Sequence, residues 1–233
     1  MRGGLFSSVV HLLYPTRCPV CGEVIGKSER FCSECANSLT PFGGSFNIKG
    51  AESFSAAFEY NVKVSPAVIL LKRGVCGNAD YALGSALADV LRENGIAKKA
   101  DVIVPVPMYR SDKRRRGYNQ SALIARVMSN ELDIPLAEKA VEKQRLTARQ
   151  KELTRDERAV NLKNAFEVTL PQNIRGKKVL LIDNDPQGSL TASLGYTPAE
   201  QKRTLNHLLL AAVDYPEDLE MQIDRTIIKT DSG

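Results

Sequence analysis

The sequence lacks any apolar run close to the roughly 20 residues that a membrane-spanning helix needs, which argues against insertion into a membrane. It has only two histidines, His11 and His207, and neither has the spacing of a metal ligand, so both are predicted to be structural. The N-terminal apolar stretch is short and runs directly into a cysteine motif, as an amphipathic helix would and a secretory signal would not. We therefore expect a cytoplasmic protein.

The length and composition are those of a globular protein. A chain of 233 residues suffices for one medium α/β domain and a small module, and 43% hydrophobic with 25% charged residues is ordinary. The net charge of +5 is unevenly distributed, with +3 over residues 1–100, +7 over 101–178 and −5 over 179–233. This change of sign near residue 179 indicates a boundary or a change of partner.

Four of the five cysteines form two closely spaced pairs. The strings "CPVC" at 18–21 and "CSEC" at 32–35 contribute Cys18, Cys21, Cys32 and Cys35. Two such pairs close a tetrahedral shell of thiolates around zinc and leave no open position, which predicts structural rather than catalytic Zn²⁺. A disulfide or redox pair is the alternative. Gly22 follows the first pair, where the turn needs a residue that tolerates positive φ. Cys76 is left over as a lone thiol.

The rest of the chain alternates between strand and helix patterns. Pro66 is predicted to begin one helix and Asn78 to cap the next. Strands are expected over 53–60, 100–107, about 166–168 and 177–183, and a further helix over 118–132. This alternation predicts an α/β fold with a parallel sheet.

A strongly basic run follows the strand at 100–107. It holds five cations within seven residues (Arg110, Lys113, Arg114, Arg115 and Arg116), and Gly117 ends it. A solvated charged loop is the simplest interpretation. Contact with nucleic acid and binding of a small anion are the alternatives, and the nearby strand end favours the small anion.

These motifs together resemble the ComF family, also described as ComF/GntX-like phosphoribosyltransferase homologues. The resemblance covers about residues 1–183 and is carried by the four cysteines, by "LLKRG" at 70–74, by "VPVPMYRSDKRRRGYNQSALIA" at 104–125 and by "RLTARQKELTRDERAVNLKNAF" at 145–166. It implies a zinc ribbon (1–45) followed by a type I phosphoribosyltransferase-like domain (50–183). Members of this family are associated with natural competence and DNA uptake.

The resemblance also implies a phosphoribosyl pyrophosphate site with Mg²⁺. The residues that it places at the phosphoribosyl and phosphate groups are Lys72, Arg115, Asp183, Asn184, Gly188 and Thr191. The family pattern there is roughly two aspartates, three residues and then Thr-Gly-x-Thr. In this sequence Asn184 replaces the second aspartate and "DPQGSLT" stands where the Thr-Gly loop is expected, so the site is predicted to be impaired.

From about residue 177 the sequence instead resembles the ParA/Soj partition ATPases, through "KKVLLIDNDPQGSLTASLGYTPAEQKRTLNHLLL". That family also needs a phosphate-binding loop with the pattern Gly-x-Gly-Lys-Thr, which occurs nowhere in this chain. The chain thus looks like a ComF-like protein whose C-terminal part (184–233) is a helical ParA-like fragment. A gene fusion, a recombination or an assembly error would each produce it.

Three classes of function follow from these features. The first is a ComF-like phosphoribosyltransferase homologue with a weakened site for phosphoribosyl pyrophosphate. The second is a non-catalytic module that binds single-stranded DNA or a competence protein, which the zinc ribbon and the +7 middle region favour. The third is a ParA-type ATPase, which the missing phosphate-binding loop opposes.

Overall fold

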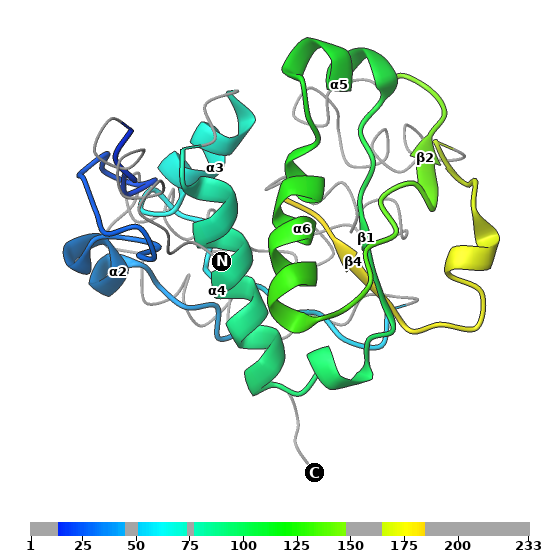
Figure 1. Ribbon diagram of the computed structural model, residues 1–233, viewed down its shortest axis with the longest axis horizontal. Helices are drawn as coiled ribbons and strands as arrows, with labels where there is room; N and C mark the ends of the chain where they lie inside the picture. Colours follow the sequence, from blue (N-terminus) through cyan, green and yellow to red (C-terminus); the bar gives the residue numbers. More distant parts are fainter. Residues whose placement is uncertain (1–13, 45–50, 74–76, 148–164, 185–233) are drawn as a thin grey trace, which may run out of the picture.

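The computed structural model describes residues 14–44, 51–73, 77–147 and 165–184. Its elements in chain order are α2 (Ser33–Ser38), α3 (Ser65–Lys72), α4 (Ala79–Glu93), η1 (Ala97–Lys99), β1 (Val102–Pro105), α5 (Arg110–Arg116), α6 (Gln120–Leu132), β2 (Val141–Lys143), β3 (Phe166–Val168), η3 (Pro171–Asn173) and β4 (Val179–Ile182). Figure 1 shows the N-terminal module with α2 on one side, helices α4 and α6 in the middle and the strands on the other side.

Strand β1 lies at the centre of a parallel arrangement, as the sequence predicts. It pairs in parallel with β4, from Val102 opposite Val179 to Pro105 opposite Ile182. On its other edge, Ile103 forms a parallel bridge with Leu136. Both β1 and β4 are short apolar runs, which is typical of strands that are covered on both faces. Residues 141–143 and 166–168 form a separate antiparallel pair, β2 and β3.

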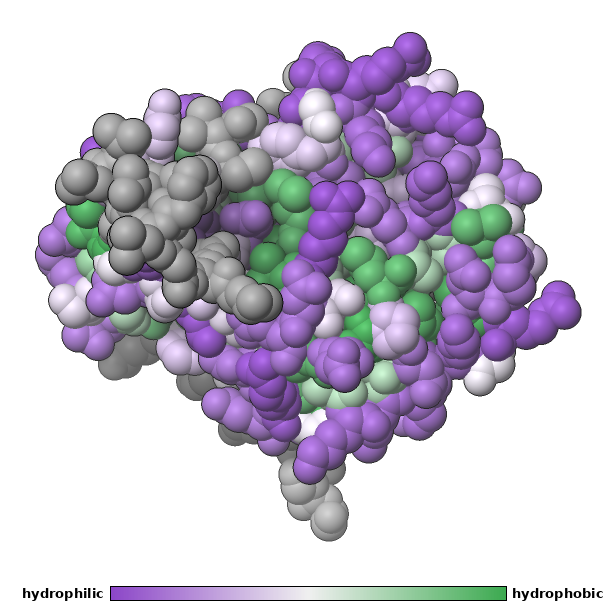
Figure 2. Space-filling model, viewed as in Figure 1, coloured by the Kyte–Doolittle hydropathy of each residue, from purple (hydrophilic) through white to green (hydrophobic). Residues whose placement is uncertain are grey.

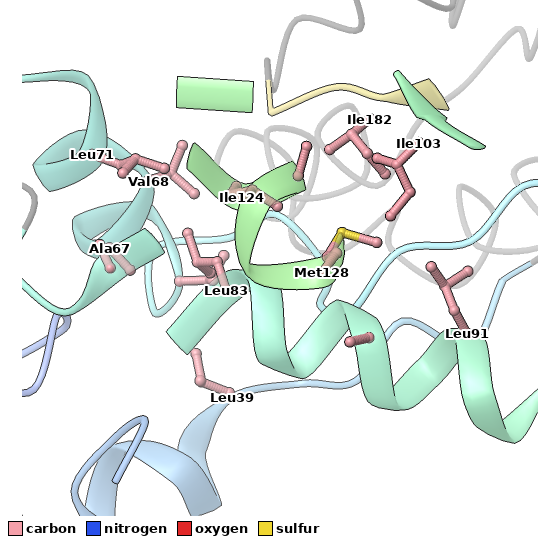
Figure 3. Close-up of a cluster of buried hydrophobic side chains, with 14 of the residues drawn as sticks. Leu39, Ala67, Val68, Leu71, Leu83, Leu91, Ile103, Ile124, Met128 and Ile182 are labelled. Atoms are coloured by element: carbon pink, nitrogen blue, oxygen red, sulfur yellow. The ribbon is translucent and has the colours of Figure 1, made fainter. Parts of the chain in front are cut away.

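The main hydrophobic core lies between the helices and one face of the β1–β4 sheet. Met128 of α6 is fully buried and lies close to Ile103 of β1 and Ile182 of β4 (Figure 3). Leu83 of α4 and Ile124 of α6 continue the same cluster toward α3. Helix α6 is therefore the layer that joins the sheet to the other helices.

Helices α4 and α6 approach each other closely at Gly84. A Cβ atom at this position would lie 2.9 Å from Cβ of Val127 and 3.1 Å from the carbonyl oxygen of Ile124. Real Cβ atoms essentially never show the first of these distances, and the second is unusually short. The absence of a side chain at Gly84 therefore lets the two helices pack this closely.

Several predicted helix boundaries are confirmed. Pro66 lies in the first turn of α3, where its missing N–H costs nothing. Gly117 adopts φ +88° immediately after α5 and ends it. The helix predicted over 118–132 is present as α6. It begins after Asn119, whose side chain accepts a hydrogen bond from the backbone N–H of Ser121 at 3.1 Å.

The predicted strand over 53–60 is wrong. Only Phe58 forms a bridge there, with Pro41, and the ladder does not continue. The ring of Phe58 packs edge-to-face on Phe31, with 5.8 Å between the centroids, so the alternating apolar residues serve the contact with the N-terminal module.

The prediction for Asn78 is half correct. Helix α4 does begin at Ala79, but the side chain of Asn78 makes no capping hydrogen bond. Its Nδ2 instead donates to the carbonyl oxygens of Glu29 at 2.8 Å and Arg30 at 3.3 Å. An asparagine that could cap a helix is used here to hold a different part of the chain.

The basic run is also different from the charged loop that we expected, because it forms the helix α5. Asp112 in its first turn and the basic residues in its last turn suit the helix dipole, which favours helix formation. The predicted N-terminal helix, Cys76 and both histidines lie outside the described residues. The predicted helical segment over 184–233 does so too, apart from its first residue. Among the described residues, no helix is both long and apolar enough to cross a membrane.

Replacing Gly84 by alanine tests the close contact between α4 and α6. In most helices this substitution stabilises the protein, by up to about 1 kcal/mol. Here the new Cβ would collide with Val127, so we expect the free energy of unfolding to fall by about 1–3 kcal/mol. Urea denaturation would measure this change. A stabilised variant would contradict the packing described here.

Candidate functional site

The four predicted cysteines come together in one cluster. The sulfur atoms of Cys18, Cys21, Cys32 and Cys35 all lie within 4.8 Å of one another, and those of Cys21 and Cys32 are 3.7 Å apart. A tetrahedral zinc site with Zn–S bonds of about 2.3 Å has sulfur–sulfur distances of about 3.8 Å. All four cysteines are free thiols, so the disulfide alternative is not what the structure shows.

Local backbone hydrogen bonds place each cysteine pair. After the first pair, the N–H of Gly22 donates to the carbonyl of Cys18 at 2.9 Å, and Gly22 has the predicted positive φ of 82°. The second pair lies at the start of α2, where the sulfur of Cys32 accepts a bond from the N–H of Cys35 at 3.5 Å. The two turns therefore present their sulfurs toward one point.

The thiols differ in acidity. Burial opposes ionisation of Cys18, but backbone N–H groups, foremost those of Cys21 and Cys32, lower its pKa to about 7. Burial raises the pKa of Cys35, and its hydrogen bonds with the neighbouring thiols raise it further. Thiols this close cannot all ionise without a cation between them, because like charges repel at short range. A divalent, thiolate-binding metal supplies that cation, so the donor set fits Zn²⁺.

Several polar contacts attach the N-terminal module to α4, among them a hydrogen bond from the hydroxyl of Tyr81 to the carbonyl of Ser28 at 3.5 Å. Asn78 at the start of α4 holds the carbonyls of Glu29 and Arg30, as described above. The guanidinium of Arg30 forms an ion pair with Asp89 on the same helix. Partial burial works against the charged guanidinium, but the hydrogen bond and charge of Asp89 raise the pKa of Arg30. The cysteine cluster is thus fixed to the helical core from residues 28–30.

A second group of polar residues gathers where β1 and β4 end and α6 begins. The N–H of Val106 donates to the carbonyl of Ile182 at 2.8 Å, which extends the strand pairing into the proline turn 105–107. Nδ2 of Asn119 donates to the carbonyl of Val106 at 2.9 Å, and the N–H of Asn184 donates to Oγ of Ser121 at 3.2 Å. The carboxyl edge of the sheet and the N-terminus of α6 therefore meet.

Asp183 and Asn184 lie at this edge, directly after β4, as the sequence predicts. Both are half-buried. Nδ2 of Asn184 is buried and has no hydrogen-bond partner among the described residues. A buried donor without an acceptor costs about 1–3 kcal/mol, so this atom marks a place where a ligand oxygen would be favourable. The assigned roles of both residues stay predictions.

The two predicted cations lie on different elements. Lys72 ends α3, and the hydroxyl of Tyr118 donates to the carbonyl of its neighbour Leu71, which brings the end of α3 beside the α5–α6 connection. Arg115 is 71% exposed and pairs with Asp112 on α5 at 2.7 Å. Gly188 and Thr191 lie outside the described residues.

Sequence reasoning missed the residues that organise the sheet edge. Arg116, rather than Arg115, reaches the start of α6 and donates to Oε1 of Gln120 at 2.6 Å. Asn119 both caps α6 and holds the proline turn. An asparagine directly before a periodic apolar segment is a capping signal. Nothing in the sequence pattern indicates which carbonyl accepts a hydrogen bond from its side-chain Nδ2.

Comparison with known proteins supports the N-terminal module and the competence resemblance. The family model "Double zinc ribbon domain" matches residues 9–56. Competence protein F of Haemophilus influenzae is 29% identical over 174 residues, which cover 71% of this chain and 72% of the relative. DNA utilization protein YhgH of Escherichia coli K12 is 31% identical over 173 residues, which cover 72% of this chain and 71% of the relative.

The protein of the same name from Salmonella typhi is 27% identical over 174 residues, which cover 72% of this chain and 70% of the relative. None of these three relatives is a partition ATPase, so the ParA-like tail stays a prediction. No solved structure gives a significant match. The parallel sheet is confirmed, while its assignment to a type I phosphoribosyltransferase fold also stays a prediction.

The metal centre can be tested by substituting single cysteines. Purified protein should contain about one equivalent of zinc, and Cys35→Ser should reduce this to near zero because three thiolates and a weaker ligand no longer close the shell. Cys76→Ser is the matched control, since the four-cysteine cluster is complete without this residue, and it should retain the metal. Elemental analysis would measure both. Zinc that survives Cys35→Ser would contradict the assignment.

Proposed function

The chain belongs to the family of competence protein F and DNA utilization protein YhgH, and from this premise we propose that it takes part in the uptake or use of DNA by binding single-stranded DNA. The observation that carries this proposal is the basic surface of α5. The zinc ribbon is a structural module in this proposal, held to the core by Asn78 and Arg30.

Four of the five cations of α5 are exposed and only weakly neutralised; Arg116 is half-buried. Arg110 is 76% exposed and pairs with Glu142 at 3.1 Å, while Lys113 is 53% exposed and pairs with Glu138 at 3.7 Å. Exposed ion pairs contribute at most about 1 kcal/mol each. A polyanion can therefore replace these carboxylates at little cost.

The basic side chains also share a surface. Arg110, Lys113 and Arg114 line one open hollow together with Gly117. Figure 2 shows a hydrophilic surface over the region of α5, at the top of the view. This surface can follow a chain of phosphates without reading bases, which favours binding that is independent of sequence and sensitive to salt.

Tyr109 lies directly before α5 and is half-buried. We propose that its ring stacks on a base. Stacking requires an unpaired base, which favours single-stranded over double-stranded DNA. The family names of the relatives mention competence and DNA utilization but no strand type, so this preference rests on the residues of this chain.

A double variant of α5 tests the proposal. Arg110→Ala with Arg114→Ala removes two phosphate contacts, so the logarithmic dependence of single-stranded DNA affinity on salt concentration should become less steep by about 1.4. Lys98→Ala with Lys99→Ala is the matched control, because it removes the same charge from the exposed η1 after α4. Fluorescence anisotropy with a labelled oligonucleotide would measure both. An equal loss of affinity for single-stranded DNA in the two variants would contradict the proposal, because it would show that binding depends only on the net charge of the protein.

A phosphoribosyl compound at the sheet edge is a second candidate ligand. It is favoured by the buried Nδ2 of Asn184, which no atom of the described residues accepts from, and by the neighbouring carboxylate of Asp183. Asp183 would hold the ribose hydroxyls, and Mg²⁺ would accompany the pyrophosphate group. Arg116 is the nearby basic residue, and its hydrogen bond to Gln120 fixes its guanidinium at this end of α6. Mg²⁺ would neutralise the pyrophosphate as it leaves.

Asn184 weakens this second site, because an amide accepts a hydroxyl proton less strongly than a carboxylate does. The loss of one charge-assisted hydrogen bond costs about 1.5–3 kcal/mol. A C-terminal segment exchanged for a ParA-like piece would account for Asn184 and for the altered loop after it. We therefore propose that the sheet edge retains the shape of a phosphoribosyl site but binds its ligand poorly.

Rebuilding the loop tests this second candidate. Replacing residues 183–191 by two aspartates followed by a Thr-Gly-x-Thr loop should improve binding of phosphoribosyl pyrophosphate at least about tenfold in calorimetry with Mg²⁺. The single substitution Asn184→Asp is the control that separates the carboxylate from the loop. Low-micromolar binding by the unaltered chain would mean that the departure from the family pattern does not matter.

A further inference from the structure

The four cysteines are unequally accessible to solvent. Cys18, Cys32 and Cys35 are buried, with 2%, 7% and 8% of their surface exposed, whereas Cys21 is exposed. Cys21 lies on the outside of the first turn, beside Gly22. A small oxidant that arrives from water therefore meets the sulfur of Cys21 before any other sulfur of the cluster.

A basic side chain lies beside the turn that holds Cys21. The guanidinium of Arg17 donates to the carbonyl of Gly22 at 2.9 Å, which places a positive charge beside this turn. When zinc is bound, Cys21 is a thiolate, which is the form of cysteine that attacks peroxides. All four ligands of a zinc-bound centre are thiolates, so exposure is what distinguishes Cys21 from the other three.

Cys32 is positioned to complete the reaction. Its sulfur is 3.7 Å from that of Cys21, while a disulfide bond is about 2.05 Å long, so the two sulfurs need to approach by less than about 2 Å. Cys32 is buried, so it is reached from Cys21 more easily than from solvent.

We propose that the zinc centre is a peroxide-sensitive switch in which Cys21 is oxidised first and a Cys21–Cys32 disulfide then forms as zinc leaves. In the first step the thiolate of Cys21 attacks hydrogen peroxide, the O–O bond breaks, and the products are a sulfenic acid and hydroxide. In the second step the sulfur of Cys32 displaces hydroxide from that sulfenic acid. Two thiolates lose two electrons in total, and one peroxide is reduced to the level of water.

The disulfide would weaken the contact between the zinc ribbon and α4, because Cys32 directly follows residues 29–31, which make this contact. Phe31 packs on Phe58, Arg30 pairs with Asp89, and the carbonyls of Glu29 and Arg30 are held by Asn78. Any displacement of Cys32 toward Cys21 pulls on this short segment. Oxidation should therefore loosen the zinc ribbon from α4 while leaving the β1–β4 sheet in place.

The test uses the full-length, zinc-loaded protein and hydrogen peroxide. Zinc release is followed with a chromogenic chelator, free thiols are alkylated, and disulfides are mapped by mass spectrometry without reduction. We expect two thiols to disappear for each zinc released, with Cys21 linked to Cys32, and a dithiol reductant should restore zinc binding. Initial disulfides within the pairs 18–21 or 32–35 would overturn the proposal, as would zinc loss without a bond between Cys21 and Cys32.

Two variants sharpen this result. Cys21→His retains a four-ligand zinc site of three cysteines and one histidine but removes the first thiol, so peroxide should release zinc at least about tenfold more slowly. An unchanged rate would overturn the role of Cys21, and if this variant fails to hold zinc, the disulfide map of the unaltered chain decides alone. Cys76→Ser is the control and should behave like the unaltered chain.

Hydrogen–deuterium exchange tests the mechanical part of the proposal. Oxidation should raise amide exchange in residues 29–32 and in the first turns of α4, and it should leave β1 unchanged. Equal protection of α4 before and after zinc release would show that the ribbon does not depend on the metal for its attachment.

Discussion

The close packing of α4 against α6 at Gly84 determines where the other parts of the described structure lie. Helix α6 covers the β1–β4 sheet through Met128, and its N-terminus meets the carboxyl edge of that sheet. Helix α4, on the other side of α6, carries the zinc ribbon through Asn78 and Asp89. The ribbon and the sheet edge are therefore connected through one helix pair, and an extra methyl group at Gly84 would separate both from their common support.

The two candidate sites are stabilised by different physical means. The ribbon has a very small apolar cluster, in which Ile25, Val20 and Phe31 surround the cysteines, and such a core is too small to fold a module of this size. Metal ligation and the packing of Val20 and Phe31 on the main core together supply the difference. The sheet edge is built instead from the ends of regular elements, where backbone groups of Val106 and Asn184 are held by side chains of α6. It is thus formed whenever the main core is formed.

The sequence allowed those features to be predicted that depend on local spacing. The cysteine pairs, the positive φ of Gly22, the start of α3 at Pro66 and the parallel pairing of two apolar strands follow from patterns within a few residues. The zinc site was accessible in this way because each half of it is a single turn.

The features that were missed depend on contacts between distant residues. Asn78 has the local signature of a helix cap, but the carbonyls of Glu29 and Arg30 compete for its side chain once the ribbon packs on α4. Phe58 alternates as in a strand, yet its ring is used by Phe31. Arg116 and Arg115 cannot be distinguished by composition, and only the direction of α5 decides which one reaches α6. In each case a tertiary partner overrides the local preference.

The order of the strands along the chain affects how the protein folds during its synthesis. Asp101 and Lys178, which join β1 to β4 at one end, are 77 positions apart. At about 5–20 residues per second, a ribosome needs roughly 4–15 s to produce β4 after β1. During that interval the ribbon and the helices can already pack. The edge of β1 that later pairs with β4 is still open, because none of the described strands synthesised before β4 pairs with it. The nascent chain therefore passes through a stage with an open strand edge, at which pairing with other nascent chains or capture by a chaperone competes with completion of the sheet.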